Sequence, residues 1–409
     1  MKTVYLICNA HIDPVWQWEW EEGAAETLST FRTAADLCEE FDGFVFNHNE
    51  AMLYRWIEEY EPQLFSRIQR LVQEGRWHIM GGWYLQPDCN MLSGESHIRQ
   101  IESGLRYFKE KFGARPKTAI GFDAFGHTRG LVQILKKTGF DSYLFCRPWE
   151  SFQHLPEGVF DWVGYDGSRV MARRINDSYS SPLGKAAEKI ETAARRSDCP
   201  IDICLWGVGD HGGGPSRKDL RDISELAERL KTEDILLLHS TPEQYFAAVK
   251  DAPHPEHIGD LNPWAPGCYT SQIQIKLAHR RLENGLFSAE KLCSAAAASG
   301  LSAYPTAELS EAQTDLMTVQ FHDMLPGTCV QNGELSALRQ LSHGEEIISR
   351  VRARAFFALS AGQEPAAEGE IPIIACNPHP YTVKGSFSCE MSLWDQNWEP
   401  EFSMPQVFD

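Results

Sequence analysis

Short apolar runs alternate with longer amphipathic stretches over the first part of the chain. The apolar runs have the length of buried strands and occur at residues 3–8, 44–46, 77–80, 118–122, 142–145, 201–206 and 235–238. The amphipathic stretches predict helices at residues 24–41, 62–74, 94–112, 131–138 and 216–230. This alternation is typical of a mostly parallel sheet covered by helices, so we predict an α/β fold.

The pattern changes after about Pro266. Long helical stretches are predicted at residues 272–286, 288–298, 310–321 and 334–359, and they indicate a helix-bundle domain. Residues 361–369 are mostly small and are interpreted as a linker. From Ile371 the sequence becomes strand-like and aromatic. We therefore expect a change of fold near each of these two points.

Composition narrows the possible partners. The 409 residues carry a formal net charge of −19, which disfavours nucleic acid and anionic membranes and fits a neutral substrate. No apolar run reaches membrane-spanning length, and residues 3–8 end at once in polar Asn9 and His11, which favours a strand over an export signal. Eleven cysteines without CxxC spacing indicate reduced thiols in a cytoplasm. The sequence is compatible with a homo-oligomer.

Three acidic motifs follow three of the predicted strands. They are His11-Ile12-Asp13, Asp123 and the loop that holds Asp210. Right-handed crossovers place the C-terminal ends of parallel strands on one face, where the site of such folds lies. We expect these carboxylates to meet there.

Each motif alone allows a plain structural interpretation. His11 and Asp13 point to the same side of an extended segment and suit a zinc ion, but Asp13 before Pro14 also suits a capped turn. Asp123 beside two glycines has an open approach or is a turn residue. His322, at the end of a predicted helix, is on its own best interpreted as a core histidine between domains.

The glycine-rich loop at residues 207–215 is not a phosphate loop. No Gly-Lys-Ser/Thr follows, and the glycine spacing does not fit a dinucleotide fingerprint. Glycines also let a bulky ring approach the backbone, so Asp210 would meet a substrate directly.

Together the motifs resemble glycoside hydrolase family 38, the class II α-mannosidases, of bacterial type. The matching segments are Ala10-His11-Ile12-Asp13-Pro14-Val15-Trp16, Phe122-Asp123-Ala124-Phe125-Gly126-His127, Gly267-Cys268-Tyr269-Thr270-Ser271 and His322-Asp323, in chain order. Ala124 departs from the proline often seen after the nucleophile. The resemblance implies a (β/α) barrel-like catalytic domain at residues 1–265, a helix-bundle middle domain at 266–362, and the beginning of a C-terminal β-sandwich domain, truncated, at 370–409.

The resemblance also implies a role for each site residue. The four Zn²⁺ ligands would be His11, Asp13, Asp123 and His322. Asp123 would also be the nucleophile, and Asp210 the general acid. The residues that contact substrate would be Trp16 under the mannose ring, Arg147 near the nucleophile, and Asp323 on a sugar hydroxyl.

The chemistry that this implies is a zinc-dependent retaining α-mannosidase, which hydrolyses terminal α-mannosides of an oligosaccharide or a small mannoside. Zinc can chelate the 2- and 3-hydroxyls of mannose while one carboxylate attacks and a second carboxyl protonates the leaving oxygen. Two alternatives remain. A zinc-dependent carbohydrate deacetylase on a related barrel would need no nucleophile at Asp123 and no stacked Trp16. A non-catalytic sugar-binding module would not need Asp123 and Asp210 together.

Overall fold

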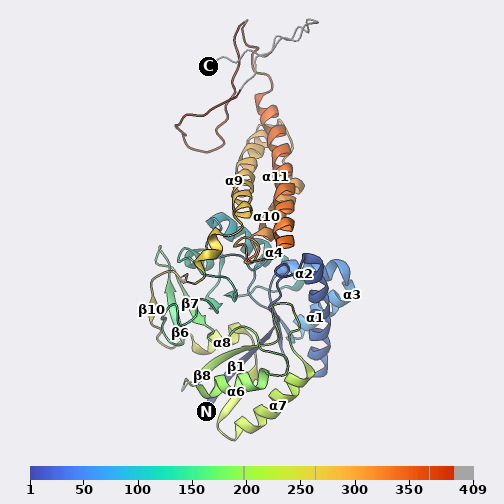
Figure 1. Cartoon of the computed structure of the whole chain (residues 1–409), viewed down its shortest axis with the longest axis vertical. Helices are drawn as coiled ribbons and strands as arrows, with labels where there is room; N and C mark the ends of the chain where they lie inside the picture. The colour runs from blue at the N-terminus through green and yellow to red at the C-terminus, as the bar shows by residue number, and fades with distance from the viewer. Residues whose placement is uncertain (197–198, 263, 368, 391–409) are drawn as a thin grey trace.

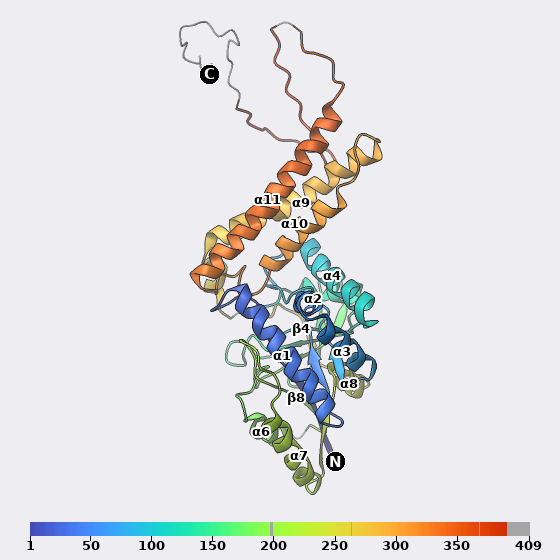
Figure 2. The same ribbon diagram turned by 90° about the vertical axis from the view of Figure 1, so that its right-hand side faces the viewer.

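A computed structural model describes residues 1–196, 199–262, 264–367 and 369–390 of the chain. The N-terminal part forms an α/β body, and long helices extend from one end of it (Figures 1 and 2). The N-terminus lies at the opposite end of the body from these helices. The predicted α/β barrel-like fold followed by a helical region is confirmed.

The first sheet is built around the first strand of the chain. Its strands are β1 (Lys2–Asn9), β2 (Phe46–His48), β3 (Trp77–Ile79), β8 (Ile201–Trp206) and β9 (Ile235–His239), and all pairs are parallel. β8 pairs with β1 from Thr3 to Cys8, whereas β2 pairs only with the last two residues of β1, Cys8 and Asn9. The C-terminal ends of β1, β2 and β8 therefore lie at the same edge.

The second sheet has the order β10-β6-β7-β5-β4. Its strands are β4 (Thr118–Gly121), β5 (Ser142–Phe145), β6 (Val159–Val163), β7 (Arg169–Arg174) and β10 (Glu256–His257). Only β6 and β7 pair antiparallel, across a turn where Gly167 has φ 80°. The Gly81 amide, just after β3, donates to the Thr118 carbonyl of β4 at 3.2 Å, so the two sheets approach each other as in a barrel.

Helices cover the sheets on the outside (Figure 2). They are α1 (Trp20–Glu40), α2 (Ala51–Tyr60), α3 (Pro62–Gln73), α4 (Gly94–Phe112), α5 (Leu131–Thr138), α6 (Ala186–Arg196), α7 (Arg217–Lys231) and α8 (Pro242–Val249). The residues at the two ends of α4 explain where this helix begins and ends. The Ser93 hydroxyl accepts from the Ser96 amide at 3.2 Å, and Gly113 ends the helix with φ 66°.

Three helices form the region that extends from the body. After the short turn η1 (Pro266–Thr270) come α9 (Ile273–Ala298), α10 (Thr306–Val319) and α11 (Gln331–Ser360). The two helices predicted at residues 272–286 and 288–298 are one helix, because nothing near Phe287 stops it and Gly285 packs on Ile348. Buried side chains of α9–α11 belong to the same hydrophobic cluster as those of α1–α3, so the two regions share a core.

The C-terminal segment shows no strand in its described part. Residues 371–390 are irregular, and large side chains such as Ile373 and Phe387 are exposed there. A strand-like sequence forms a strand only when a neighbour accepts its backbone hydrogen bonds. The rest of the predicted β-domain, residues 391–409, lies outside the described residues, so its beginning at residue 370 stays a prediction.

Two further properties of the described chain are the hydropathy of its helices and the state of its cysteines. Within residues 1–390, apart from the few that are not described, no helix is long and apolar enough to cross a membrane. All eleven cysteines lie in the described part, and none forms a disulfide.

Candidate metal and catalytic site

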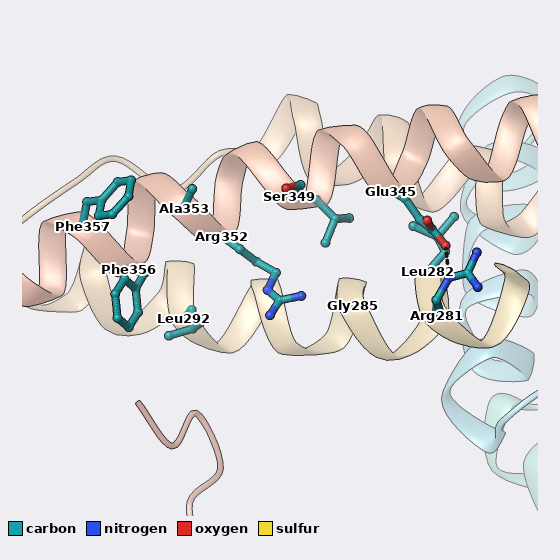
Figure 3. A pocket seen from close by; sticks show the side chains of 11 residues that line it. Arg281, Leu282, Gly285, Leu292, Glu345, Ser349, Arg352, Ala353, Phe356 and Phe357 are labelled. Atoms are coloured by element: carbon teal, nitrogen blue, oxygen red, sulfur yellow. Dashed lines mark hydrogen bonds and ion pairs between the residues drawn. The ribbon is translucent and has the colours of Figure 1, made fainter. Parts of the chain in front are cut away.

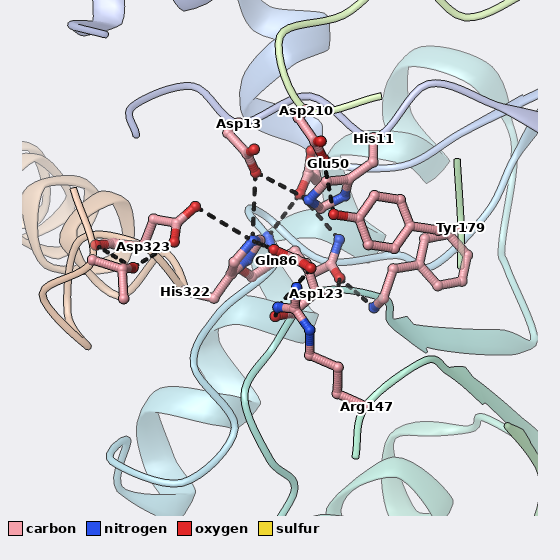
Figure 4. Close-up of polar contacts among 12 residues, drawn as sticks. His11, Asp13, Glu50, Gln86, Asp123, Arg147, Tyr179, Asp210, His322 and Asp323 are labelled. Atoms are coloured by element: carbon pink, nitrogen blue, oxygen red, sulfur yellow. Dashed lines mark hydrogen bonds and ion pairs between the residues drawn. The ribbon is translucent and has the colours of Figure 1, made fainter. Parts of the chain in front are cut away.

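The acidic motifs meet beyond the C-terminal ends of β1 and β8 in the first sheet and β4 in the second (Figure 4). Ile12, just beyond β1, forms isolated bridges with Asp210 and His211 beyond β8, and the Asp13 amide donates to the Asp210 carbonyl at 2.9 Å. Gly207 makes this approach possible. It has φ 121°, and a Cβ there would lie 2.0 Å from the Asn9 carbonyl oxygen.

Two histidines and two aspartates form a tight cluster. His11 Nε2 lies 3.0 Å from Asp13 Oδ1, and His322 Nε2 lies 3.5 Å from the same oxygen. His322 Nε2 is also 3.8 Å from Asp123 Oδ2. His11 and Asp13 follow β1, Asp123 follows β4, and His322 follows α10. The structure thus brings together all four residues that the sequence nominated as metal ligands.

The cluster has the properties of a cation site. His11 Nε2, Asp13 Oδ1 and His322 Nε2 are buried and face one another, and no further group of the described chain bonds them. Buried polar atoms that have only one another as partners are incompletely satisfied, and a metal ion between them would satisfy them. The donor set of imidazole nitrogens and carboxylate oxygens is one that zinc accepts. Two triplets have ligand atoms within 4.8 Å of one another: His11, Asp123 and His322, and Asp13, His322 and Asp323.

The electrostatics of the cluster also favour a cation. Burial tends to lower the pKa of His11, but the adjacent Asp13 outweighs it and raises that pKa to about 10. Burial tends to raise the pKa of Asp13, and His11 overcomes it, so that this pKa is lowered to about 2. In the absence of a metal the site therefore holds a proton on His11 against the negative charge of Asp13, and a bound cation would displace that proton.

The His322 ring is oriented by the backbone. Its Nδ1 lies 2.9 Å from the Gln86 carbonyl oxygen, which can only accept, so Nδ1 carries the hydrogen. When the ring is neutral, Nε2 is its unprotonated nitrogen, and it faces Asp13 and Asp123. A metal-binding histidine is commonly fixed in this way.

Asp123 is paired with Arg147. Arg147 Nη1 is 2.6 Å from Asp123 Oδ1 and also donates to the Asp123 carbonyl at 2.6 Å. The guanidinium carbon lies 4.4 Å from the ring centre of Trp264, and the Arg147 carbonyl contacts His127 Nε2 at 3.0 Å. The structure places Arg147 beside the predicted nucleophile, as the sequence suggested.

Asp210 is a second carboxyl at the same edge. Tyr179 donates its hydroxyl to Asp210 Oδ1 at 2.8 Å (Figure 4). The pKa of Asp210 is raised, first by burial and then by the nearby Asp13 and Asp123, while His11 and the Tyr179 hydroxyl act against that rise. A carboxyl with a raised pKa can hold a proton and give it up to a substrate.

Asp323 and Trp16 complete the predicted set. Asp323 is 3% exposed, and burial together with Asp13 raises its pKa to about 7. Thr328 donates its hydroxyl to Asp323. Trp16 is half-buried, its ring centre lies 5.7 Å from that of Trp18, and its carbonyl accepts from the Val330 amide at 2.8 Å. Whether Trp16 stacks on a sugar stays a prediction.

Sequence reasoning missed three residues that contact the site. Gln86 hydrogen-bonds both His322 and the backbone at Asp123. The Glu50 carboxylate accepts from Gln86, and the Tyr179 hydroxyl donates to Asp210. Glu50 follows β2 closely, and this position was the one signal available for it, whereas Gln86 lies seven residues after β3.

A separate cavity of about 550 Å³ lies between α9 and α11 (Figure 3). Its lining contains no histidine and one carboxylate, Glu345, which is paired with Arg281 at 3.1 Å. The remaining lining is mostly apolar and includes Phe356 and Phe357. This cavity lacks the groups that metal or acid–base chemistry requires.

Two known protein families match the sequence of this chain. The family described as Glycosyl hydrolases family 38 N-terminal domain matches residues 1–266, and the Alpha mannosidase middle domain matches residues 264–359. The chain therefore belongs to glycoside hydrolase family 38, a family of α-mannosidases. This assignment favours the glycosidase interpretation over a deacetylase or a non-catalytic module.

Individual relatives agree with the family. Human Alpha-mannosidase 2C1 is 32% identical over 380 residues, which are 90% of this chain and 36% of that protein. The Alpha-mannosidase of Saccharomyces cerevisiae is 26% identical over 355 residues, covering 81% of this chain and 32% of that protein. The crystal structure of an alpha-mannosidase from Enterococcus faecalis V583 has a TM-score of 0.77 at 20% identity, over 88% of this chain and 43% of that chain. The chain spans about a third of the length of the two curated relatives.

Proposed function

We propose that this chain carries the active site of a zinc-dependent retaining α-mannosidase, which hydrolyses terminal α-mannosides through a covalent mannosyl ester on Asp123. One observation supports this most. Buried ligand atoms of His11, Asp13 and His322 converge beside Asp123, and a second carboxyl, Asp210, lies next to Asp13 along the backbone bridge of Ile12. A retaining glycosidase needs two such carboxyls in different environments.

The ligands of the zinc ion would be His11, Asp13, Asp123 and His322. A bound zinc ion supplies a Lewis acid for the hydroxyls of the sugar and positive charge that keeps a carboxylate ionised. His322 would offer Nε2 to the ion, because Nδ1 is committed to the Gln86 carbonyl.

The remaining steps belong to side chains. The Asp123 carboxylate attacks the anomeric carbon, the bond to the leaving oxygen breaks, and Asp210 donates its proton to that oxygen. The Asp210 carboxylate then takes a proton from water, which attacks the ester and releases mannose with its original anomeric configuration. Arg147 holds the Asp123 carboxylate at 2.6 Å.

The substrate side is formed by Trp16 and Asp323. Trp16 offers an apolar face to the sugar ring, and Asp323 accepts from a sugar hydroxyl. A neutral mannose-containing oligosaccharide or small mannoside suits the net charge of −19. The domain limits 1–265, 266–362 and 370–409 belong to the same proposal, as does a cytoplasmic location, which eleven unpaired cysteines support.

The decisive experiment follows hydrolysis of an aryl α-mannoside by proton NMR. We expect α-mannose as the first product from the wild-type chain and no turnover from Asp123→Asn. A 2-fluoro or 5-fluoro mannosyl trap should label Asp123 in peptide mass maps. β-Mannose as the first product, or a label on another residue, would exclude the mechanism.

A further inference from the structure

We propose that Gln86 is a positioning residue that fixes the Asp123 carboxylate and the His322 ring relative to each other. This inference rests on the proposed function, because it concerns residues that act as ligands there. Gln86 follows β3 in a loop, it is fully buried, and it stands between the two segments that carry Asp123 and His322 (Figure 4).

Four groups of Gln86 contact three different parts of the chain. Its side-chain oxygen accepts from the Phe122 amide at 2.6 Å and from the Asp123 amide at 3.4 Å. Its main-chain oxygen lies 2.9 Å from His322 Nδ1. Its main-chain and side-chain N–H groups both donate to Glu50 Oε1, at 3.2 and 3.5 Å.

These contacts act on the direction of two ligand atoms. The amides of Phe122 and Asp123 lie where β4 has ended, so no strand partner fixes the backbone there and the Gln86 side chain does so instead. The same residue fixes which nitrogen of His322 faces Asp13. A rotation of the Gln86 side chain would therefore free the backbone at Asp123, while the main-chain oxygen of Gln86 kept its contact with His322, so the two ligands would no longer be fixed relative to each other.

The loop around Gln86 is itself joined to the helical region. Pro87 forms an antiparallel bridge with Phe321, and the Asp88 amide donates to the Gln320 carbonyl at 2.9 Å. Residues 86–88 thus run beside the segment that ends in His322. The position of His322 relative to the body is set through this loop.

Glu50 is held in an unfavourable backbone conformation by the same arrangement. It has φ 71°, which is uncommon for a residue other than glycine. It precedes α2, yet its side chain makes no capping hydrogen bond to that helix. The Glu50 carboxylate instead accepts from Gln86, and this orients the amide so that its oxygen, not its nitrogen, faces Phe122.

The test compares zinc affinity by chelator competition in four purified variants. Gln86→Met removes the acceptor at nearly constant volume and should weaken zinc binding by roughly 10–100-fold, as loss of a residue that supports a ligand commonly does. Gln86→Glu places a carboxylate against Glu50 and should also weaken it. The exchanged pair Glu50→Gln with Gln86→Glu restores one acid and one amide, and it should regain most of the affinity.

Thr118→Val is the matched control. Thr118 is fully buried in β4, and its hydroxyl bonds Ser142 at 2.8 Å at the end of the strand away from Asp123. This change should lower the melting temperature about as much as Gln86→Met and leave zinc affinity unchanged. With an aryl mannoside, Gln86→Met should lower kcat more than it raises KM.

The outcomes separate the two proposals. Zinc binding and mannoside hydrolysis by the wild-type chain, with unchanged affinity in Gln86→Met, would overturn the positioning role alone. A wild-type chain with neither zinc nor hydrolysis would overturn the proposed function and this role with it. If Gln86→Met does not fold, the comparison of Gln86→Glu with the exchanged pair decides, and no recovery in the exchanged pair rejects the role.

Discussion

His322 Nε2 lies 3.5 Å from Asp13 Oδ1, although Asp13 follows the first strand of the chain and His322 follows the second helix of the extended region. Neither the body nor the helices alone contains the whole cluster. The site is therefore formed only when the two regions dock, and a cation held there would stabilise that docking.

The first prediction concerns His322→Ala. Elemental analysis after dialysis should find one zinc per wild-type chain and much less in this variant. Added zinc should raise the melting temperature of the wild type and have little effect on the variant, because one of four ligands is missing. The matched control is His97→Gln, a buried histidine of α4 outside the cluster, which should keep its zinc. An active protein without metal would contradict the proposal.

The second prediction concerns Asp210→Ala. General acid catalysis contributes roughly 10²–10⁴-fold, and only where the leaving group needs a proton. Cleavage of a mannobioside should therefore almost cease, whereas formation of the ester from a dinitrophenyl mannoside should continue. Azide should then speed turnover. Equal loss with both substrates would show that the acid lies elsewhere and that Asp210 only supports its loop.

The third prediction concerns the pH dependence that Tyr179 imposes on Asp210. Its hydroxyl donates to the carboxylate and so favours the charged form, which lowers the pKa of Asp210. Tyr179→Phe should raise that pKa. Because the acid acts in its protonated form, the alkaline limb of kcat/KM should move to higher pH. A limb that stays in place, or moves to lower pH, would reject the assignment.

The fourth prediction concerns Arg147→Lys. Lysine keeps the charge but loses the planar group that bonds Asp123 and lies over Trp264. Loss of a charge-assisted hydrogen bond of about 1.5–3 kcal/mol should lower kcat/KM by roughly 10–100-fold. Arg129→Lys is the control, since Arg129 lies 4.6 Å from the Tyr165 ring and contacts none of the acidic cluster. Equal effects in both variants would point to a general loss of stability.

The fifth prediction concerns stability in mild acid. Burial lowers the pKa of His48 and His127 to about 3, and of His97 and His279 to about 4. The unfolded chain takes up these protons near pH 6.5 and the folded chain does not. The contribution of these four histidines to the free energy of unfolding is therefore present above pH 6.5 and is lost as the pH falls toward 4, by about 1.3 kcal/mol per histidine at pH 5.5.

Urea unfolding at pH 7.5 and 5.5 checks this prediction. His97→Gln removes one such histidine and should lose less stability between the two pH values than the wild type does. Equal losses would show that His97 takes up no proton on unfolding.

The sequence predicted those elements whose ends carry their own signals. Residues 131–138, 142–145 and 201–206 are observed with the predicted limits as α5, β5 and β8. α2 was missed because the residue before it, Glu50, uses its side chain on Gln86 and offers no capping pattern. The β6–β7 hairpin was missed although Asp166-Gly167 is a common turn pair.

The site was predictable where strand ends and motifs coincide, as at His11, Asp13 and Asp123. Gln86 could not be found in this way. Its contacts depend on the antiparallel bridge between Pro87 and Phe321, which joins residues far apart in the chain. A single sequence contains no signal for such a pairing.

The length of α11 sets the distance between the site and the residues that follow this helix. The helix starts beside Trp16, where the Val330 amide bonds the Trp16 carbonyl, and its 30 residues extend for about 45 Å away from the body (Figures 1 and 2). Any residue after Ser360 that is to touch the sugar must travel back over that distance, which takes at least about 13 extended residues. The length of the connector, more than its chemistry, thus decides which later residues can take part in the reaction.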